Sequence, residues 1–505
     1  MTLETPRVLP DDDYNRRLVA NVHPADWANP APARKYNLVV LGGGTAGLVS
    51  AVGAAGLGAK VALVERQLLG GDCLNFGCVP SKGLLRAARA AHEFSDGASF
   101  GVRIQGSLLV DFAAAAERMR KVRARISEHD SAQRLAGLGV DVFLGDASFV
   151  GPEAVQVGAQ RLRFSKAVIA TGARAAEPPI PGLGEVGYFT NETVFSLTQA
   201  PRRLAVIGAG PIGCELAQAF RRLGSQVSIV GRAKRLLPRE DQETAALLQG
   251  VFEKEGIALR LDAKVERVEQ QPGAKVLVVS RSGERDDIRC DEILVAVGRA
   301  PNIEGLGLAQ AGVAFDERGV RVDGRLRTSN PRIYAAGDIC SAYKFTHAAD
   351  AMARVVIQNA LFFGRKRAAR LVIPWCTYTD PEIAHVGINE DQARKRPDVA
   401  TYRVDMSTVD RAILDGEELG FAKIHARKKD GQILGATLVA RHAGEMIPEL
   451  VLAMGERLGL KTIAGTIHPY PTQAEILKKA AEAHLRSRLT PSLQQWLKRY
   501  FRWRR

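Results

Sequence analysis

Two cysteines, Cys73 and Cys78, lie five residues apart in a glycine-rich segment that opens a predicted helix. In a regular helix, Cα atoms at positions i and i+5 lie roughly 8.6 Å apart, whereas a disulfide needs about 4.4 to 6.8 Å. The backbone must therefore depart from a regular helix if the two thiols are to join, and Gly77 permits that departure. A helix N-terminus and Lys82 nearby would lower a thiol pKa and supply the thiolate that disulfide exchange requires.

The main alternative for this cysteine pair is a zinc site. Zinc would need further Cys or His residues at ligand spacing, which the neighbouring sequence lacks, so no metal site is predicted. Six cysteines in 505 residues are also too few for a disulfide-stapled secreted scaffold. The remaining cysteines are scattered singly, which is typical of buried apolar residues; they are Cys214, Cys290, Cys340 and Cys376.

Two glycine-rich turns are the elements expected to position the bound groups that react with the thiols. An apolar strand at 38–41 leads into Gly-Gly-Gly-Thr-Ala-Gly at 42–47, and a helix and a second strand follow. The arrangement recurs over 204–230, with Gly-Ala-Gly-Pro-Ile-Gly at 208–213. One such turn is weak evidence, but two copies, each with the correct strand and helix, predict two dinucleotide-binding folds.

The residues that end the second strand of each unit differ in charge. Glu65 ends the first, and its carboxylate would bind ribose hydroxyls and repel a 2′-phosphate, which favours FAD or NAD. The second unit has Gly231 and Arg232 there, with Lys234 and Arg235 close behind. Cations in place of a carboxylate favour NADPH over NADH. The alternative is that Arg232 is an ordinary exposed arginine and both nucleotides serve.

Length and composition predict a soluble globular protein of three or four domains, with 46% hydrophobic and 25% charged residues. The two strand–turn–helix units give it an α/β fold class. The net charge of +15 could indicate a nucleic-acid partner. The basic residues are spread along the chain without a recognition motif, so no nucleic-acid binding is predicted. The polar N-terminal stretch lacks an apolar segment that could be a signal peptide, and a cytoplasmic location is expected.

The segment from Cys73 to Lys82 resembles the redox-active motif of the class I pyridine nucleotide-disulfide oxidoreductases, and its Val-Pro-Ser-Lys ending at 79–82 is most similar to mercuric reductases. Further matching motifs lie at 170–172, 296–302, 328–331 and 336–338. The resemblance implies two Rossmann-like domains, for FAD and NADPH, and a C-terminal α+β domain that forms a homodimer. The implied division is a polar extension (1–35), a first FAD-binding segment (36–190), the NAD(P) domain (191–305), a second FAD-binding segment (306–370), the dimerisation domain (371–485) and a basic aromatic tail (486–505).

The resemblance also implies roles for individual residues. Cys78 would face the flavin, Cys73 would attack the substrate, and Lys82 would lie beside the flavin and pair with Glu215. The residues implied for FAD are Gly42, Gly44, Thr45, Ala46, Gly47, Glu65, Arg66, Gly71, Asp72, Lys82, Gly145, Ala147, Thr171, Gly172, Gly337 and Asp338. Those implied for NADPH are Gly208, Gly210, Ile212, Gly213, Arg232 and Gly298.

The family pattern breaks near the C-terminus. Disulfide reductases of this family carry His-Pro-Thr and a later glutamate there, supplied by the partner subunit, but this chain has Tyr470 before Pro-Thr and Glu475 after it. Tyrosine is a poor base at neutral pH, because its ordinary pKa is about 10. His468 lies two residues early, and a shifted loop could bring it in. The chain also lacks the C-terminal cysteine pair and the N-terminal CxxC of mercuric reductases.

The resemblance implies hydride transfer from NADPH through flavin to the Cys73–Cys78 disulfide, and then to a small-molecule disulfide or thiophilic metal ion. One alternative is a membrane-surface NAD(P)H dehydrogenase that reduces quinones or oxygen. Another is a redox-sensing flavoprotein without turnover. The tail from residue 492 has apolar and basic residues spaced as in an amphipathic helix, which would make a weak membrane-surface contact. Its other interpretation is a solvated tail with partly docked aromatic residues.

Overall fold

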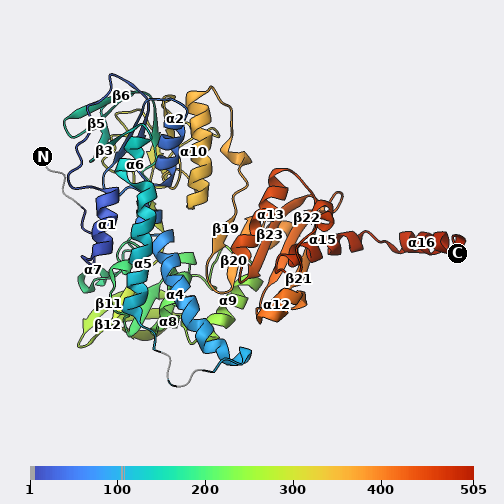
Figure 1. Cartoon of the computed structure of the whole chain (residues 1–505). Helices are drawn as coiled ribbons and strands as arrows, with labels where there is room; N and C mark the ends of the chain where they lie inside the picture. The colour runs from blue at the N-terminus through green and yellow to red at the C-terminus, as the bar shows by residue number, and fades with distance from the viewer. Residues whose placement is uncertain (1–5, 104–105, 107–108) are drawn as a thin grey trace. The chain divides into compact units, whose positions relative to one another are not determined.

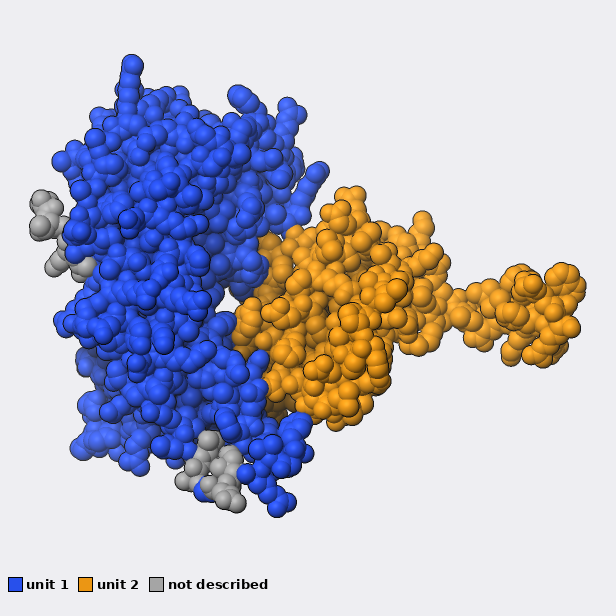
Figure 2. All heavy atoms as spheres, in the orientation of Figure 1, with its two compact units in different colours: residues 1–236, 252–371 blue, residues 237–251, 372–505 orange. Residues whose placement is uncertain are grey.

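The computed structural model describes residues 6–103, 106 and 109–505. The chain divides into two compact units, coloured separately in Figure 2. Unit 1 comprises residues 1–236 and 252–371, and unit 2 comprises residues 237–251 and 372–505. No helix within the described ranges is both long enough and apolar enough to cross a lipid bilayer.

The first sheet of unit 1 has a parallel core in the order β3-β2-β1-β6, and β18 adds to β6, also in parallel. Such a sheet is covered by helices on its faces, and α2 (Thr45–Gly56) and α10 (Thr346–Leu361) pack together beside it (Figure 1). Two short antiparallel strands extend β6. The strands are β1 (Tyr36–Leu41), β2 (Val61–Glu65), β3 (Val140–Leu144), β4 (Ala147–Phe149), β5 (Ala154–Val157), β6 (Gln160–Ile169) and β18 (Ile333–Ala335).

The second sheet of unit 1 is also parallel, in the order β10-β9-β8-β14. Helix α8 (Pro211–Arg222) follows β8, as the second glycine-rich turn predicts. An antiparallel sheet, β11-β12-β13, is inserted before β14. The strands are β8 (Arg203–Ile207), β9 (Gln226–Gly231), β10 (Ala258–Leu261), β11 (Lys264–Gln271), β12 (Ala274–Arg281), β13 (Glu284–Cys290) and β14 (Glu292–Val295).

The N-terminal stretch differs from the polar extension predicted over 1–35, because it contains a packed helix, α1 (Asp13–Val22). Asp12 caps the helix by accepting a hydrogen bond from a backbone N–H of the first turn. Leu18 and Val22 are fully buried, and the helix packs against α5 (Phe112–Ile126). Two apolar positions four residues apart dock the helix together with the buried Asn15, although its other residues are mostly polar.

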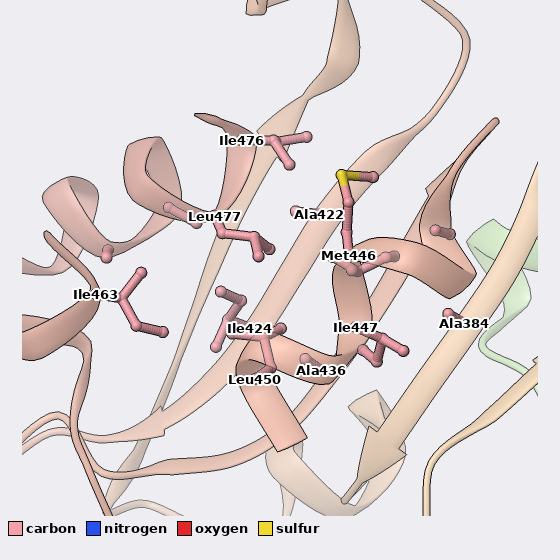
Figure 3. Close-up of a cluster of buried hydrophobic side chains, with 14 of the residues drawn as sticks. Ala384, Ala422, Ile424, Ala436, Met446, Ile447, Leu450, Ile463, Ile476 and Leu477 are labelled. Atoms are coloured by element: carbon pink, nitrogen blue, oxygen red, sulfur yellow. The ribbon is translucent and has the colours of Figure 1, made fainter. Parts of the chain in front are cut away.

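Unit 2 contains a five-stranded antiparallel sheet in the order β19-β20-β23-β22-β21. Its core joins the sheet to α13 and α15, with Ile424 of β22 facing Leu450 and Leu477 of the helices (Figure 3). Each large buried aliphatic side chain contributes about 1.5 to 3 kcal/mol. The elements are β19 (Trp375–Thr377), β20 (Glu382–Gly387), β21 (Val399–Asp405), β22 (Phe421–Arg427), β23 (Ile433–Ala440), α13 (Ala443–Gly455), α14 (Leu460–Gly465), α15 (Glu475–Ser487) and α16 (Pro491–Trp503).

Candidate redox site

The helix predicted to carry both cysteines is interrupted between them. Helix α3 (Gly71–Asn75) ends at Phe76, and α4 (Cys78–Asp96) begins after its N-cap, Gly77. A Cβ atom on Gly77 would lie 2.9 Å from the backbone oxygen of Asp72, so only glycine fits this tight passage. The expected departure from regular helix is confirmed. Both cysteines are free thiols here; Cys73 is half-buried and Cys78 is exposed.

The Cys78 thiolate is stabilised by several neighbours. A hydrogen bond from the Cys73 thiol is the largest cause that lowers the pKa of Cys78, and Thr346 and Lys82 lower it further. The same bond raises the pKa of Cys73. Thr346 Oγ1 lies 3.5 Å from Cys78 Sγ. Because Cys78 begins α4 and Thr346 begins α10, the positive ends of two helices also favour a negative charge at this sulfur.

An ion cluster surrounds the start of residues 71–82, the segment that carries both cysteines and that we call the redox segment. Arg299 Nη1 lies 3.1 Å from Asp72 Oδ2, and Arg299 Nε lies 3.5 Å from Asp338 Oδ2. Asn191 donates a hydrogen bond to the other Asp72 oxygen at 2.9 Å. Burial raises the pKa of Asp338, and the charges of Arg299 and Lys344 oppose that rise. The arginine thus holds two carboxylates together that would otherwise repel each other.

Lys82 projects from the second turn of α4 to α8. Its Nζ donates to Glu215 Oε2 at 2.8 Å, which is the pairing that the family resemblance implies. The Glu215 side chain is 8% exposed and that of Lys82 is 36% exposed. The pair therefore links the redox helix to the helix that follows the second glycine-rich turn.

A buried arginine connects α1 to the redox segment. Arg123 is 1% exposed and donates to Asn15 Oδ1 of α1 at 2.7 Å and to the Asn75 backbone oxygen at 2.6 Å. The Asn75 side chain in turn donates to the backbone oxygens of Leu69 and Gly71. Since Asn75 lies between the two cysteines in sequence, this network fixes the backbone from which Cys73 projects.

The residues predicted for FAD gather at one edge of the first sheet. Most of them follow the carboxyl ends of β1, β2, β3, β6 and β18, where open α/β sheets bind ligands. Glu65 is the last residue of β2, Ala147 begins β4, and Lys82 lies in α4. The Glu65 carboxylate accepts hydrogen bonds from the N–H groups of Gly43 (2.6 Å) and Gln67 (2.7 Å), and burial raises its pKa. Gly71 has φ +58°, and a Cβ there would lie 2.6 Å from Gly44 Cα, so the redox segment rests directly on the first glycine-rich turn.

This edge fits a dinucleotide. The N-cap of α2 is Gly44, which offers no side-chain oxygen to the first N–H groups of the helix, and such N–H groups bind a pyrophosphate. The same holds for Gly210 at the start of α8, where a Cβ would meet nothing within 4 Å among the described residues. Gly47 and Gly213 lie so close to the turn backbone that a Cβ would clash at 1.8 and 2.1 Å.

Strand register relates the two nucleotide units residue by residue. Leu41 pairs with Val64 and Glu65 follows, whereas Ile207 pairs with Val230 and Gly231 follows. Gly231 therefore occupies the position of Glu65. A Cβ on Gly231 would lie 2.7 Å from the Ala209 Cβ, which leaves little room for an acidic side chain. Arg232 is exposed directly after the strand, and Gly298 follows β14 at the same edge.

Tyr470, Glu475 and His468 belong to unit 2. Tyr470 is 71% exposed and its hydroxyl donates to Asp410 Oδ2 at 2.9 Å, a bond that raises the tyrosine pKa further from neutrality. His468 Nε2 lies 3.2 Å from the Glu449 carboxylate, so this ring already has a structural partner. The catalytic roles of Tyr470 and Glu475 require the thiols of a partner subunit and stay predictions.

The sequence did not predict the contacts of three residues at this site. They are Thr346 beside Cys78, Asn191 beside Asp72, and Arg299 between two carboxylates. Thr346 is 268 residues from Cys78, and Asn191 is 119 residues from Asp72. The only sequence signal was for Arg299, which lies within the motif at 296–302.

Two Rossmann-like units in one compact body, with a thiol pair at a helix start beside the first glycine-rich turn, define a flavoprotein oxidoreductase of the disulfide-reducing class. The chain belongs to the pyridine nucleotide-disulphide oxidoreductase family, whose profile matches residues 36–353, and its dimerisation domain matches residues 373–481. Family members contain FAD and use NAD(P)H. The predicted family and fold class are confirmed, and so are FAD and a nicotinamide nucleotide, NAD(P)H, as cofactors.

Curated relatives carry two kinds of name. The chain is 36% identical over 448 residues to a mercuric reductase of Lysinibacillus sphaericus, covering 88% of this chain and 82% of that one. It is also 36% identical over 463 residues to a dihydrolipoyl dehydrogenase of Thermus scotoductus, covering 89% and 97%. Among solved structures, the HOCl-induced flavoprotein disulfide reductase RclA from Escherichia coli has a TM-score of 0.80 at 28% identity, covering 88% and 99%.

Proposed function

We propose that the protein is an NADPH-dependent disulfide reductase that passes electrons through Cys73 and Cys78 to a small-molecule disulfide or a thiophilic metal ion. The observation that carries the proposal is the thiol pair itself. Cys78 begins α4 beside Thr346, and both the Cys73 thiol and Lys82 lower its pKa. Relatives named mercuric reductase, and a solved Cu(II) complex of RclA, support a metal ion as one class of acceptor.

Bound FAD would supply the group that accepts hydride from the nicotinamide and delivers two electrons to the Cys73–Cys78 disulfide. Glu65 would hold its ribose, and the N-termini of α2 and α8 would hold the pyrophosphates of FAD and NADPH. Lys82, fixed by Glu215, would keep a positive charge beside the sulfur of Cys78. These residues would bind and orient the two nucleotides and the Cys78 sulfur, and they would exchange no electrons themselves.

The reduced pair shares one proton, and this supports a route that needs no histidine. Cys73 passes its proton along the hydrogen bond to the Cys78 sulfur, and the Cys73 thiolate attacks an acceptor R–S–S–R′ to form a mixed disulfide and expel RS⁻. The proton on Cys78 moves to RS⁻. Cys78 then attacks the Cys73 sulfur, which restores the internal disulfide and releases R′S⁻. A proton from water converts R′S⁻ to R′SH, so each cycle transfers two electrons and consumes one NADPH and this one further proton.

A panel of acceptors tests the proposal: glutathione disulfide, lipoamide, Hg(II), Cu(II), quinones and oxygen, each monitored by NADPH oxidation. At least one disulfide or metal ion should be reduced by the wild type and not by Cys73→Ser. Cys376→Ser, a half-buried cysteine of unit 2, is the matched control and should retain activity. Quinone or oxygen reduction that survives Cys73→Ser, with no disulfide or metal activity in the wild type, would contradict the proposal.

The proposed NADPH preference rests on Gly231 replacing a carboxylate and on the cations that follow. An Arg232→Ala/Lys234→Ala double variant should raise KM for NADPH about tenfold, because the loss of a charge pair with the 2′-phosphate costs about 1.4 kcal/mol or more. KM for NADH should stay within twofold. A wild type that prefers NADH would disprove this assignment.

The dimerisation domain supports a homodimer. In such a dimer we propose that Tyr470 of one subunit acts near the thiols of the other as a neutral hydroxyl that accepts a hydrogen bond, and not as a base, because it donates its own O–H to Asp410 and this bond raises its pKa. Tyr470→Phe should then lower turnover without shifting the pH midpoint of activity. A shifted midpoint would contradict the role of a neutral hydroxyl.

A further inference from the structure

Helix α16 (Pro491–Trp503) carries its own start signals. The Thr490 side chain accepts a hydrogen bond from the Leu493 N–H, and Pro491 occupies the first helical position. At 100° per residue, its six apolar side chains fall within an arc of about 160°. This apolar face consists of Leu493, Trp496, Leu497, Tyr500, Phe501 and Trp503.

The opposite face of α16 is polar and positively charged. It carries Gln494, Gln495, Lys498, Arg499 and Arg502. After Glu482 the chain contains no Asp or Glu, whereas it contains seven Lys and Arg from Arg486 onward. No acidic neighbour along the tail therefore balances this charge.

The apolar face of α16 is uncovered. None of the 13 residues of the helix, all of which the structure describes, is buried. Trp496 is 59% exposed, Phe501 57% and Trp503 81%. Figures 1 and 2 show α16 as the C-terminal end of the chain, beyond α15. The core of unit 2 is complete without α16, since it uses side chains from α13, α14, α15 and the sheet.

We propose that α16 is an interfacial anchor that lies along an anionic lipid surface, with its apolar face among the acyl chains and its basic face toward the headgroups. Thirteen residues span roughly 20 Å, too short to cross a bilayer core of about 30 Å but suited to lying in its plane. Tryptophan and tyrosine favour the headgroup boundary, and the tail charge complements phosphatidylserine.

Other partners fit the exposed helix α16 less well than a lipid surface does. A second copy of the chain carries the same net charge of +15 and the same basic tail, so approach of two tails is repulsive. A nucleic acid would match the basic face but would leave six apolar side chains in water. A lipid surface satisfies both faces at once, and a homodimer would present two such helices, which strengthens binding through avidity.

Co-sedimentation with vesicles tests the anchor. The probes are phosphatidylcholine vesicles with and without phosphatidylserine, and the proteins are the full chain and a chain that ends at residue 489. Each Lys or Arg near an anionic surface contributes roughly fivefold to partitioning. The full chain should therefore bind the anionic vesicles at least tenfold more strongly than the truncated chain, and added salt should weaken binding. Both proteins should reduce acceptors equally in solution, which confirms that the truncated chain is folded.

Matched variants separate the two faces. Leu497→Ser/Phe501→Ser should reduce vesicle binding at least tenfold, whereas Gln494→Ser/Gln495→Ser on the polar face should leave it unchanged. Two of the four tryptophans of the chain lie in α16, so fluorescence should shift to the blue on anionic vesicles only when the tail is present. Equal partitioning of full and truncated chains would overturn the proposal. So would tail-dependent binding to RNA, or tail-dependent self-association, without vesicle binding.

Discussion

The contact between Thr346 and Cys78 can be removed with almost no change of shape by Thr346→Val. A hydrogen bond to a charged group contributes about 1.5 to 3 kcal/mol, and this one is a 3.5 Å contact to an exposed sulfur, so we take the lower end. Since about 1.4 kcal/mol corresponds to one pKa unit, the pKa of Cys78 should rise by about one unit. The sign follows from the charge: the hydroxyl stabilises the thiolate and not the thiol.

Alkylation of the reduced protein by iodoacetamide, followed against pH, measures this shift. Tandem mass spectrometry distinguishes the labels on Cys73 and Cys78. One pH unit below the wild-type midpoint, Cys78 should react about tenfold more slowly in Thr346→Val, and above both midpoints the rates should be equal.

Thr346→Ser keeps the hydroxyl and is the matched control, with a midpoint expected near that of the wild type. If Thr346→Val also leaves the midpoint unchanged, the hydroxyl does not act on this sulfur. The lowered pKa of Cys78 would then come from the Cys73 thiol, Lys82 and the two helix N-termini alone.

Three further substitutions test individual buried groups. Glu215→Gln should lower the free energy of unfolding by about 2 kcal/mol in urea titration, since it breaks an ion pair that is buried at Glu215 and partly exposed at Lys82. An unchanged unfolding midpoint would show that this ion pair does not stabilise the fold. Asn15→Ala should lower the free energy of unfolding by about 2 kcal/mol, because it removes the partner of the buried Arg123 charge. The same substitution should speed hydrogen exchange in α3. Unchanged exchange would show that α1 does not hold the backbone around the two cysteines. Burial raises the pKa of Glu240 from 4.5 to about 7. A carboxyl that binds its proton more tightly when folded destabilises the fold as the pH rises, so the free energy of unfolding should fall by about 3 kcal/mol between pH 4.5 and pH 7, and Glu240→Gln should flatten that slope.

Local sequence signals were sufficient for the nucleotide units. The glycine spacing at 42–47 and 208–213 and the apolar strands before each turn predicted β1, β8 and the helices α2 and α8. The distance that a disulfide permits predicted the break at Gly77. In each case the physical constraint acts within about twenty residues, so one stretch of sequence contains all of it.

Contacts between distant segments could not be predicted in this way. The residue types of Thr346 and Asn191 are common, and neither has a local pattern that would mark it as a neighbour of a thiol or of Asp72. His468 was left open as a base because the sequence does not show that Glu449 lies 3.2 Å from its ring. Side-chain partners that meet only through the tertiary fold need the structure.

The two terminal helices outside the matched family segments show why composition decides whether an extension docks. Helix α1 has smaller apolar side chains than α16, but Leu18 and Val22 are buried, and its polar Asn15 meets a buried arginine. Helix α16 has six apolar residues on one face, none of them buried. Hydrophobic burial of the α16 face would be more favourable per residue than that of α1, so its exposure in a folded chain calls for a surface outside the chain. The basic face of α16 favours a negatively charged surface. The positive charge of the tail is therefore the stronger reason to propose an anionic lipid surface, and the apolar area is the weaker one.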